Sequence, residues 1–211
     1  MGGNYDDLFL RFKTAVVLIL VYGALFYLGG VYFALGLCIT CVIFIIELNR
    51  LVVFKTNRLI FLVCGVILCF SSFSLWDLFN QNKLFLIFLL AVVMVTDICG
   101  YFVGKFLGGP KVSQVLSPNK TWSGLVGGWV GAIIVAILGS YLFESILFAV
   151  LIGVSLSLFS QAGDFLESYL KRRAKVKDSS QWLPGHGGFL DRFDSVIGAS
   201  FGYGLLSYVV L

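Results

Sequence analysis

The chain alternates between long apolar runs and short segments that contain charged and turn-forming residues. The apolar runs cover residues 14–28, 31–46, 59–76, 84–104, 122–143, 145–163 and 195–211. Each run is close to the roughly 20 residues that a helix needs to cross the hydrocarbon of a bilayer. The pattern predicts an all-α fold, a polytopic integral membrane helical bundle with about seven transmembrane helices. A turn at Gly29-Gly30 divides the first two runs, and one long tilted helix is the alternative there.

Composition supports this class. Hydrophobic residues make up 59% of the 211 residues and charged residues 12%, and the mean hydropathy is +0.99. These values lie far outside the range of soluble globular domains. We expect a single membrane domain over residues 1–211, with N-terminal hydrophobic helices in 1–90. The remaining region, 91–211, is expected to carry the chemistry in two polar loops, 105–121 and 168–194.

The distribution of lysine and arginine predicts the orientation, because these residues favour the cytoplasmic ends of transmembrane helices. With seven spans, every lysine and arginine except Lys83 falls on one side, including Lys55. We therefore expect both polar loops to face the cytoplasm, and Lys83 and Glu144 to face the opposite side. The net charge of +4 then reflects topology and gives no reason to expect nucleic acid as a partner.

The five cysteines all lie in the apolar runs: Cys38, Cys41, Cys64, Cys69 and Cys99. Cys38 and Cys41 form a CxxC pair, but a second pair and a nearby histidine are missing, so a zinc site is not indicated. We expect the cysteines to be small packing residues.

Carboxylates at membrane depth are costly, by about 2.5–3.5 kcal/mol on insertion scales, so Asp97, Asp164 and Glu167 each require an explanation. Asp164 and Glu167 are three residues apart and share a helix face, and Asp191 and Asp194 repeat that spacing. Four or five carboxylates can thus converge at one depth beside a cationic loop, as a magnesium–phosphate site requires. For Glu167 and Asp178, a salt bridge to a nearby lysine or arginine is an equal alternative.

The 168–194 segment holds the cationic run and the only histidine of the chain. Arginine and lysine side chains can neutralise several phosphoryl oxygens, although such a run beside a membrane also attracts anionic lipid headgroups. The following Pro184–Gly188 stretch places three glycines around His186, and such a backbone can approach an anion closely. This combination favours a phosphate site. The cationic run consists of Lys171, Arg172, Arg173, Lys175 and Lys177.

A second polar segment, 117–124, precedes the fifth apolar run. Ser117, Lys120 and Thr121 offer hydroxyl and ammonium donors there, and helix N-termini favour anions. A simple capping turn would have a similar sequence, so this segment alone is a weak signal.

Taken together, these segments resemble the signature of the phosphatidate cytidylyltransferases, also called CDP-diacylglycerol synthases. The resemblance rests on Ser168-Tyr169-Leu170-Lys171-Arg172, Lys177-Asp178 and Leu183-Pro184-Gly185-His186-Gly187-Gly188-Phe189-Leu190-Asp191-Arg192-Phe193-Asp194. Gly163-Asp164, the segment 117–122 and the run from Asp97 to Gly104 support it. The resemblance covers about residues 97–195. The first 90 residues match only in being hydrophobic, and the chain looks short beside typical members.

The resemblance implies that CTP and phosphatidate react to give CDP-diacylglycerol and pyrophosphate, for phospholipid biosynthesis. It implies Mg²⁺ as the cofactor, with Asp164 and Asp191 as first-choice ligands and Asp194 or Asp97 as second choices. The catalytic residues would be Asp164, Lys171, Arg172, His186 and Asp191. The substrate-binding residues would be Ser117, Lys120, Thr121, Ser168, Lys177, Asp178, Gly187, Gly188 and Arg192.

The implied location is the cell inner membrane, as a multi-pass protein with a cytoplasmic active site among membrane lipids, and a homodimer is a further expectation. Two other functions remain open from the sequence. One is a related CTP-dependent transferase or kinase that acts on another lipid, such as an ether lipid or a polyprenol. The other is a small membrane transporter, which would spread ionisable residues through the depth of the bilayer.

Overall fold

The computed structural model describes residues 3–52 and 57–209, so Lys55 lies outside the described residues. The helices are α1 Gly3–Leu28, α2 Gly30–Leu51, α3 Arg58–Gln81, α4 Lys83–Leu107, α5 Trp122–Leu138, α6 Ile146–Arg173 and α7 Leu190–Val209. A short 3-10 turn, η1 (Ser140–Leu142), follows α5, and β1 (Lys111–Ser113) pairs antiparallel with β2 (Ser117–Thr121). The predicted all-α membrane-type bundle is confirmed, with this small hairpin as an addition.

Two separate helices form at the N-terminus, which decides between the alternatives there. Gly29 has a φ of 67° and Gly30 a φ of 45°, a left-handed conformation that glycine adopts without steric cost. The backbone therefore reverses between α1 and α2.

Membrane-spanning potential differs among the helices. Within the described part of the chain, five are long and apolar enough to cross a membrane: α1 from Phe9, α2, α3, α4 and α6. The α5 helix is apolar but has 17 residues. The count of seven transmembrane spans therefore stays a prediction.

The predicted loops are shorter in the structure. The α6 helix continues to Arg173, so the first residues of the expected 168–194 loop are helical, and the connection to α7 covers 174–189. Residues 105–107 likewise belong to α4. Thr121 caps α5, where its hydroxyl accepts a hydrogen bond of 3.1 Å from the Gly124 N–H.

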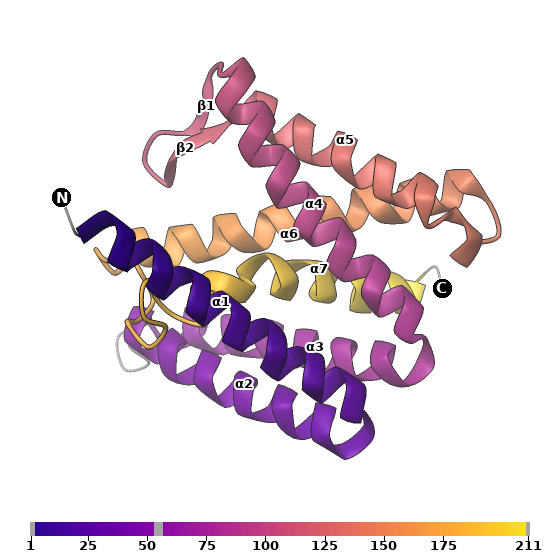
Figure 1. Ribbon diagram of the computed structural model, residues 1–211, viewed down its shortest axis with the longest axis horizontal. Helices are drawn as coiled ribbons and strands as arrows, with labels where there is room; N and C mark the ends of the chain where they lie inside the picture. Colours follow the sequence, from indigo (N-terminus) through magenta and orange to yellow (C-terminus); the bar gives the residue numbers. More distant parts are fainter. Residues whose placement is uncertain (1–2, 53–56, 210–211) are drawn as a thin grey trace.

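Helices α6 and α7 occupy the centre of the bundle (Figure 1). The α3 helix packs against α7, and α5 packs against α6. Figure 1 shows the N-terminus of α1, the hairpin and the connection between α6 and α7 toward one end of the bundle, and the α3–α4 and α5–α6 connections toward the other. The polar segments far apart in the sequence thus gather at one end.

Glycines allow α6 and α7 to touch. A side chain at Gly163 would collide with the backbone oxygen of Asp194, and one at Gly198 would collide with the backbone oxygen of Phe159. The two backbones are therefore as close as helices can pack. This contact brings acidic residues of α6 next to the first turns of α7.

Candidate active site

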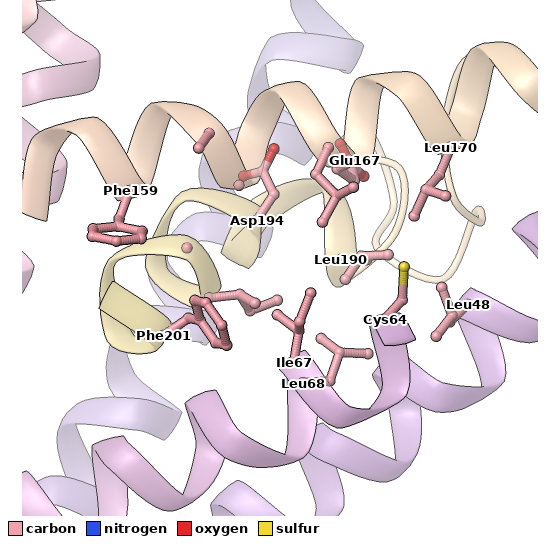
Figure 2. Close-up of a pocket in the computed structure, with 15 residues that line it drawn as sticks. Leu48, Cys64, Ile67, Leu68, Phe159, Glu167, Leu170, Leu190, Asp194 and Phe201 are labelled. Carbon is pink, nitrogen blue, oxygen red and sulfur yellow. The ribbon is translucent and has the colours of Figure 1, made fainter. Parts of the chain in front are cut away.

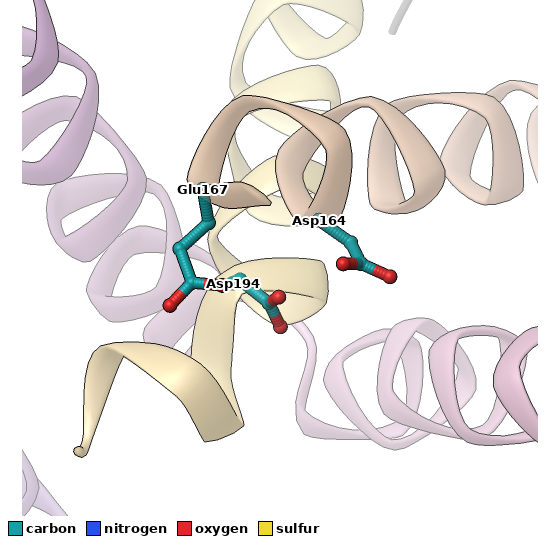
Figure 3. A group of neighbouring side chains, drawn as sticks. All are labelled: Asp164, Glu167 and Asp194. Atoms are coloured by element: carbon teal, nitrogen blue, oxygen red, sulfur yellow. The ribbon is translucent and has the colours of Figure 1, made fainter. Parts of the chain in front are cut away.

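Three carboxylates meet where α6 and α7 cross. Asp164 and Glu167 come from α6 and Asp194 from α7, and one oxygen of each lies within 4.8 Å of the others. In the view of Figure 3, the carboxylate of Asp194 lies between those of Glu167 and Asp164. We call these three residues the acid group. Its members include Asp164 and Asp194, both predicted metal ligands.

Glu167 is the most buried member, with only 4% of its surface exposed. The Lys171 ammonium lies 2.5 Å from its Oε2 and forms an ion pair with it. The Lys120 ammonium, from β2, pairs with the Asp164 carboxylate. The charges of these two lysines do not balance those of the three carboxylates, so the acid group can accept a further cation.

A polar cavity of about 630 Å³ opens on one side of the acid group. Asp164 and Asp97 line it, and so do residues of α4, α5, α6 and the hairpin. The other polar side chains of its lining are Thr96, Tyr101, Lys105, Lys111, Asn119, Lys120, Thr121 and Gln161. Three lysines around one cavity are suited to a polyanion such as a triphosphate.

An apolar cavity of about 240 Å³ lies on the other side, between α3, α6 and α7. Figure 2 shows Glu167 and Asp194 at this cavity, opposite aliphatic and aromatic side chains such as Ile67 and Phe201. Asp164 therefore lines the polar, lysine-containing cavity, and Glu167 and Asp194 line the apolar cavity.

Asp191 has a different environment from the one predicted. Its Oδ1 accepts a hydrogen bond from Lys171 Nζ at 2.8 Å. Its Oδ2 accepts from the Ser179 N–H at 2.8 Å, the Ser179 hydroxyl at 2.9 Å and the Gly188 N–H at 2.7 Å. Both oxygens are occupied within the protein, so the geometry favours Asp191 as an anchor of the loop. Its role as a metal ligand stays a prediction.

The histidine segment folds back on α7. Arg192 donates two hydrogen bonds to the His186 backbone oxygen, at 2.9 and 2.6 Å. Partial burial lowers the pKa of His186, and the positive charges of Arg192 and Arg11 lower it further. His186 is therefore neutral at neutral pH, and its ring can accept or donate a hydrogen bond without carrying charge.

Other predicted residues are not part of the described lining of either cavity. Arg172 is exposed and donates to the Leu116 backbone oxygen at 3.3 Å. Lys177 and Asp178 are exposed in the 174–189 connection. The described linings of the two cavities contain none of Ser117, Ser168, Lys171, Arg172, Lys177, Asp178, His186, Gly187, Gly188, Asp191 and Arg192. Their roles in substrate binding stay predictions.

The sequence reasoning missed three residues. Lys105 and Lys111 line the polar cavity but were interpreted only as topology signals. Glu47 is fully buried in α2 and contacts the 174–189 connection. Glu47 follows directly after the 31–46 apolar run, and the cost of placing a carboxylate near membrane depth is the signal that could have identified it.

Comparison with known proteins settles the family. The family model described as the cytidylyltransferase family matches residues 52–209. The chain belongs to the cytidylyltransferase family. This match extends beyond the 97–195 region that carries the motifs and includes α3 through α7. The acid group, the polar cavity and the lining of the apolar cavity except Leu48 therefore belong to the matched part of the chain.

Individual relatives agree. The chain is 34% identical over 211 residues to a phosphatidate cytidylyltransferase of Rickettsia bellii (strain RML369-C), covering 91% of this chain and 87% of the relative. It is 46% identical over 121 residues to the protein of that name from Brucella suis biovar 1 (strain 1330), covering 54% and 43%. It is 41% identical over 134 residues to that of Bacillus subtilis (strain 168), covering 62% and 50%. The matched part thus spans half or less of the last two relatives.

Proposed function

We propose that the protein is a membrane-bound phosphatidate cytidylyltransferase, which transfers the cytidylyl group of CTP to phosphatidate. The observation that carries this proposal is the position of the acid group between a lysine-lined polar cavity and an apolar cavity. A water-soluble nucleotide and a lipid need such different environments, and their phosphates must meet where the two spaces adjoin.

The polar cavity is assigned to the triphosphate of CTP. Lys105, Lys111 and Lys120 supply three positive charges, and Asn119 and Thr121 offer hydrogen-bond donors. Charge-assisted hydrogen bonds to phosphate are about twice as strong as neutral ones. These residues would hold the nucleotide and neutralise the pyrophosphate as it leaves.

The apolar cavity is assigned to the hydrocarbon part of phosphatidate next to its headgroup. Its lining of α3, α6 and α7 side chains excludes water. Burial of apolar lipid surface contributes about 25 cal/mol per Å². The lipid phosphate would then lie at the polar edge of this cavity, beside Glu167 and Asp194.

Two anionic phosphates beside three carboxylates require a cation. Carboxylate oxygens are the ligands that Mg²⁺ prefers, and one carboxylate oxygen from each member of the acid group lies within 4.8 Å of the others. The residues present therefore fit this metal, and Asp164, Glu167 and Asp194 would hold it, with Asp97 close by in the polar cavity. When bound, Mg²⁺ would neutralise phosphate oxygens and stabilise the leaving group.

The reaction needs little else from the protein. A phosphate oxygen of the lipid forms a bond to the α-phosphorus of CTP, while the bond from that phosphorus to the bridging oxygen of the β-phosphate breaks. Pyrophosphate leaves with this oxygen and its electron pair. Because the lipid phosphate is already ionised, no general base is required, and the side chains act by orientation and charge neutralisation.

The remaining parts of the proposal concern location and partners. We infer that the protein lies in the cell inner membrane, with the acid group toward the cytoplasm where CTP is present. The gathering of polar segments at one end of the bundle supports this orientation, as does the bias of lysine and arginine. A homodimer stays a prediction.

The test is product formation by purified protein in detergent with radiolabelled CTP, Mg²⁺ and a panel of lipids. The panel contains phosphatidate, its ether-linked analogue and a polyprenyl phosphate. We expect CDP-diacylglycerol and one pyrophosphate per product, with phosphatidate preferred. Preferred use of another lipid would move the assignment to a related transferase, and the absence of any CDP-lipid would overturn it.

A further inference from the structure

Glu47 lies near the end of α2 and none of its surface is exposed. Its Oε1 accepts hydrogen bonds from the Ser180 hydroxyl at 2.6 Å and the Phe189 N–H at 3.0 Å. Its Oε2 accepts from the Leu190 N–H at 2.7 Å and the Ser179 hydroxyl at 3.3 Å. A buried carboxylate with this many donors has its desolvation cost compensated within the protein.

The four donors come from two parts of the chain. Ser179 and Ser180 lie within the connection between α6 and α7, Phe189 is its last residue, and Leu190 is the first residue of α7. The first N–H groups of a helix have no partner within the helix. Glu47 supplies that partner from a different helix. Its negative charge also interacts favourably with the positive end of the α7 dipole.

The sequence of the connection leaves space for this contact. A side chain at Gly188 would collide with the Ser179 hydroxyl, and its Cβ would lie 2.6 Å from Glu47 Oε1. The glycine therefore lets the backbone pass directly beside the carboxylate. This gives Gly188 a structural reason that is separate from the predicted substrate contact.

The contact bears on the candidate active site through α7. Asp191 and Asp194 lie in the first turns of the helix that Glu47 caps. The Ser179 N–H donates to Asp191, and Asp191 accepts from Lys171, whose ammonium lies beside Glu167. The start of α7 and the acid group are thus joined by short polar contacts.

We propose that Glu47 is a positioning residue for the acid group. By holding the start of α7 and the 174–189 connection, it places Asp194 against Asp164 and Glu167, and it keeps the Asp191–Lys171 pair beside Glu167. The inference deepens the proposed function and rests on it for the catalytic readout. Glu47 itself touches neither cavity as described.

The decisive variant is Glu47→Gln, which keeps the shape but replaces one acceptor oxygen by an NH₂ group. That group faces backbone N–H donors and cannot accept from them. The matched control is Ser71→Ala. Ser71 is 1% exposed and its hydroxyl donates to the Ile197 backbone oxygen of α7 at 2.9 Å, so the control also removes a buried link to α7, one turn beyond Asp194.

Two measurements on detergent-purified protein separate positioning from plain stability. The first is the affinity for Mn²⁺, from electron paramagnetic resonance without substrates. The second is the Mg²⁺ concentration for half-maximal CDP-lipid formation. Outer partners of metal sites typically change affinity or activity by about 10- to 100-fold, so we expect Glu47→Gln to weaken Mn²⁺ binding and raise the Mg²⁺ requirement by at least about 10-fold. Ser71→Ala should leave both unchanged.

Unchanged Mn²⁺ affinity in monodisperse Glu47→Gln protein would overturn the inference, as would the absence of Mn²⁺ binding to wild type. If Glu47→Gln does not fold, Ser180→Ala decides, since it removes one donor and leaves the others. It should weaken Mn²⁺ binding by about 3- to 10-fold, and an unchanged value would contradict the proposal. If wild type binds Mn²⁺ and Glu47→Gln binds it more weakly, but wild type makes no CDP-lipid, only the proposed function is overturned.

Discussion

The two cavities beside the acid group have different linings and no described lining residue in common, although each is lined by at least one member of the acid group. The polar cavity is lined by three lysines and lies among α4, α5, α6 and the hairpin. The apolar cavity lies between α3, α6 and α7, and Glu167 and Asp194 are its acidic residues. In the proposed reaction the polar cavity holds the nucleotide, the apolar cavity holds the lipid, and the acid group contacts the phosphates of both. Damage to the acid group should therefore affect the whole reaction, whereas damage to one cavity should affect one substrate.

The largest effect is expected for Asp164→Asn, which removes a charge that both phosphates depend on. The rate of CDP-lipid formation should fall by about 100- to 1,000-fold, the range for loss of one strong electrostatic contact in an active site. Steady-state rates with both substrates saturating would measure it. The control is Asp77→Asn, near the end of α3 and toward the other end of the bundle. An equal loss of rate in both variants would contradict the account.

Lys120→Ala should sharpen the difference between the cavities. The loss of one charge-assisted contact costs about 1.5–3 kcal/mol, or about 10- to 100-fold in affinity. We expect this as a higher KM for CTP with a smaller change for phosphatidate, because Lys120 lines only the polar cavity. Lys83→Ala, at the other end of the bundle, serves as the control. A rise confined to the phosphatidate KM would reverse the assignment of the two cavities.

Ile67→Trp should impair the use of phosphatidate and not that of CTP, because the larger tryptophan side chain fills the apolar cavity. A single methylene in an apolar pocket changes discrimination by about 10-fold or more. We therefore expect a KM for phosphatidate raised by about 10-fold, with the KM for CTP unchanged. An unchanged phosphatidate KM in well-folded protein would show that lipid binds elsewhere.

The smallest effect concerns pH and lies outside both cavities. The pKa of His186 is lowered in the folded protein, so the unfolded chain binds its proton more readily. His186 therefore contributes stability that is present above about pH 6.5 and is lost as pH falls through its lowered folded pKa. Between pH 7.5 and 5.0, the thermal midpoint of wild type should fall further than that of His186→Gln. An equal fall in both proteins would remove His186 as the source.

The sequence predicted local features better than long-range ones. The apolar runs and the Gly29-Gly30 turn predicted the helices, because each depends on neighbouring residues. The spacing of Asp164 and Glu167 predicted a shared helix face, yet the sequence favoured Asp191 over Glu167 as a ligand. Only the folded connection shows that Asp191 is occupied by backbone and side-chain donors.

Residues that act across long separations were the least predictable. Glu47 contacts residues more than 130 positions away, and the sequence gives no sign of which segment it meets. Likewise, Lys105 and Lys111 have the same local pattern as lysines that only mark topology. Their place around one cavity depends on how α4, the hairpin and α6 pack, which follows from many apolar contacts together.

The most direct test of the central claim is a Mg²⁺ titration of CDP-lipid formation by Glu167→Gln. Glu167 is buried, contacts Lys171 and faces the apolar cavity, so replacing its carboxylate tests the acid group from the side of the lipid. The account predicts a maximal rate lower by about 100-fold or more and a higher Mg²⁺ requirement, in protein that elutes as a single species by gel filtration. A wild-type rate with an unchanged Mg²⁺ requirement would contradict it.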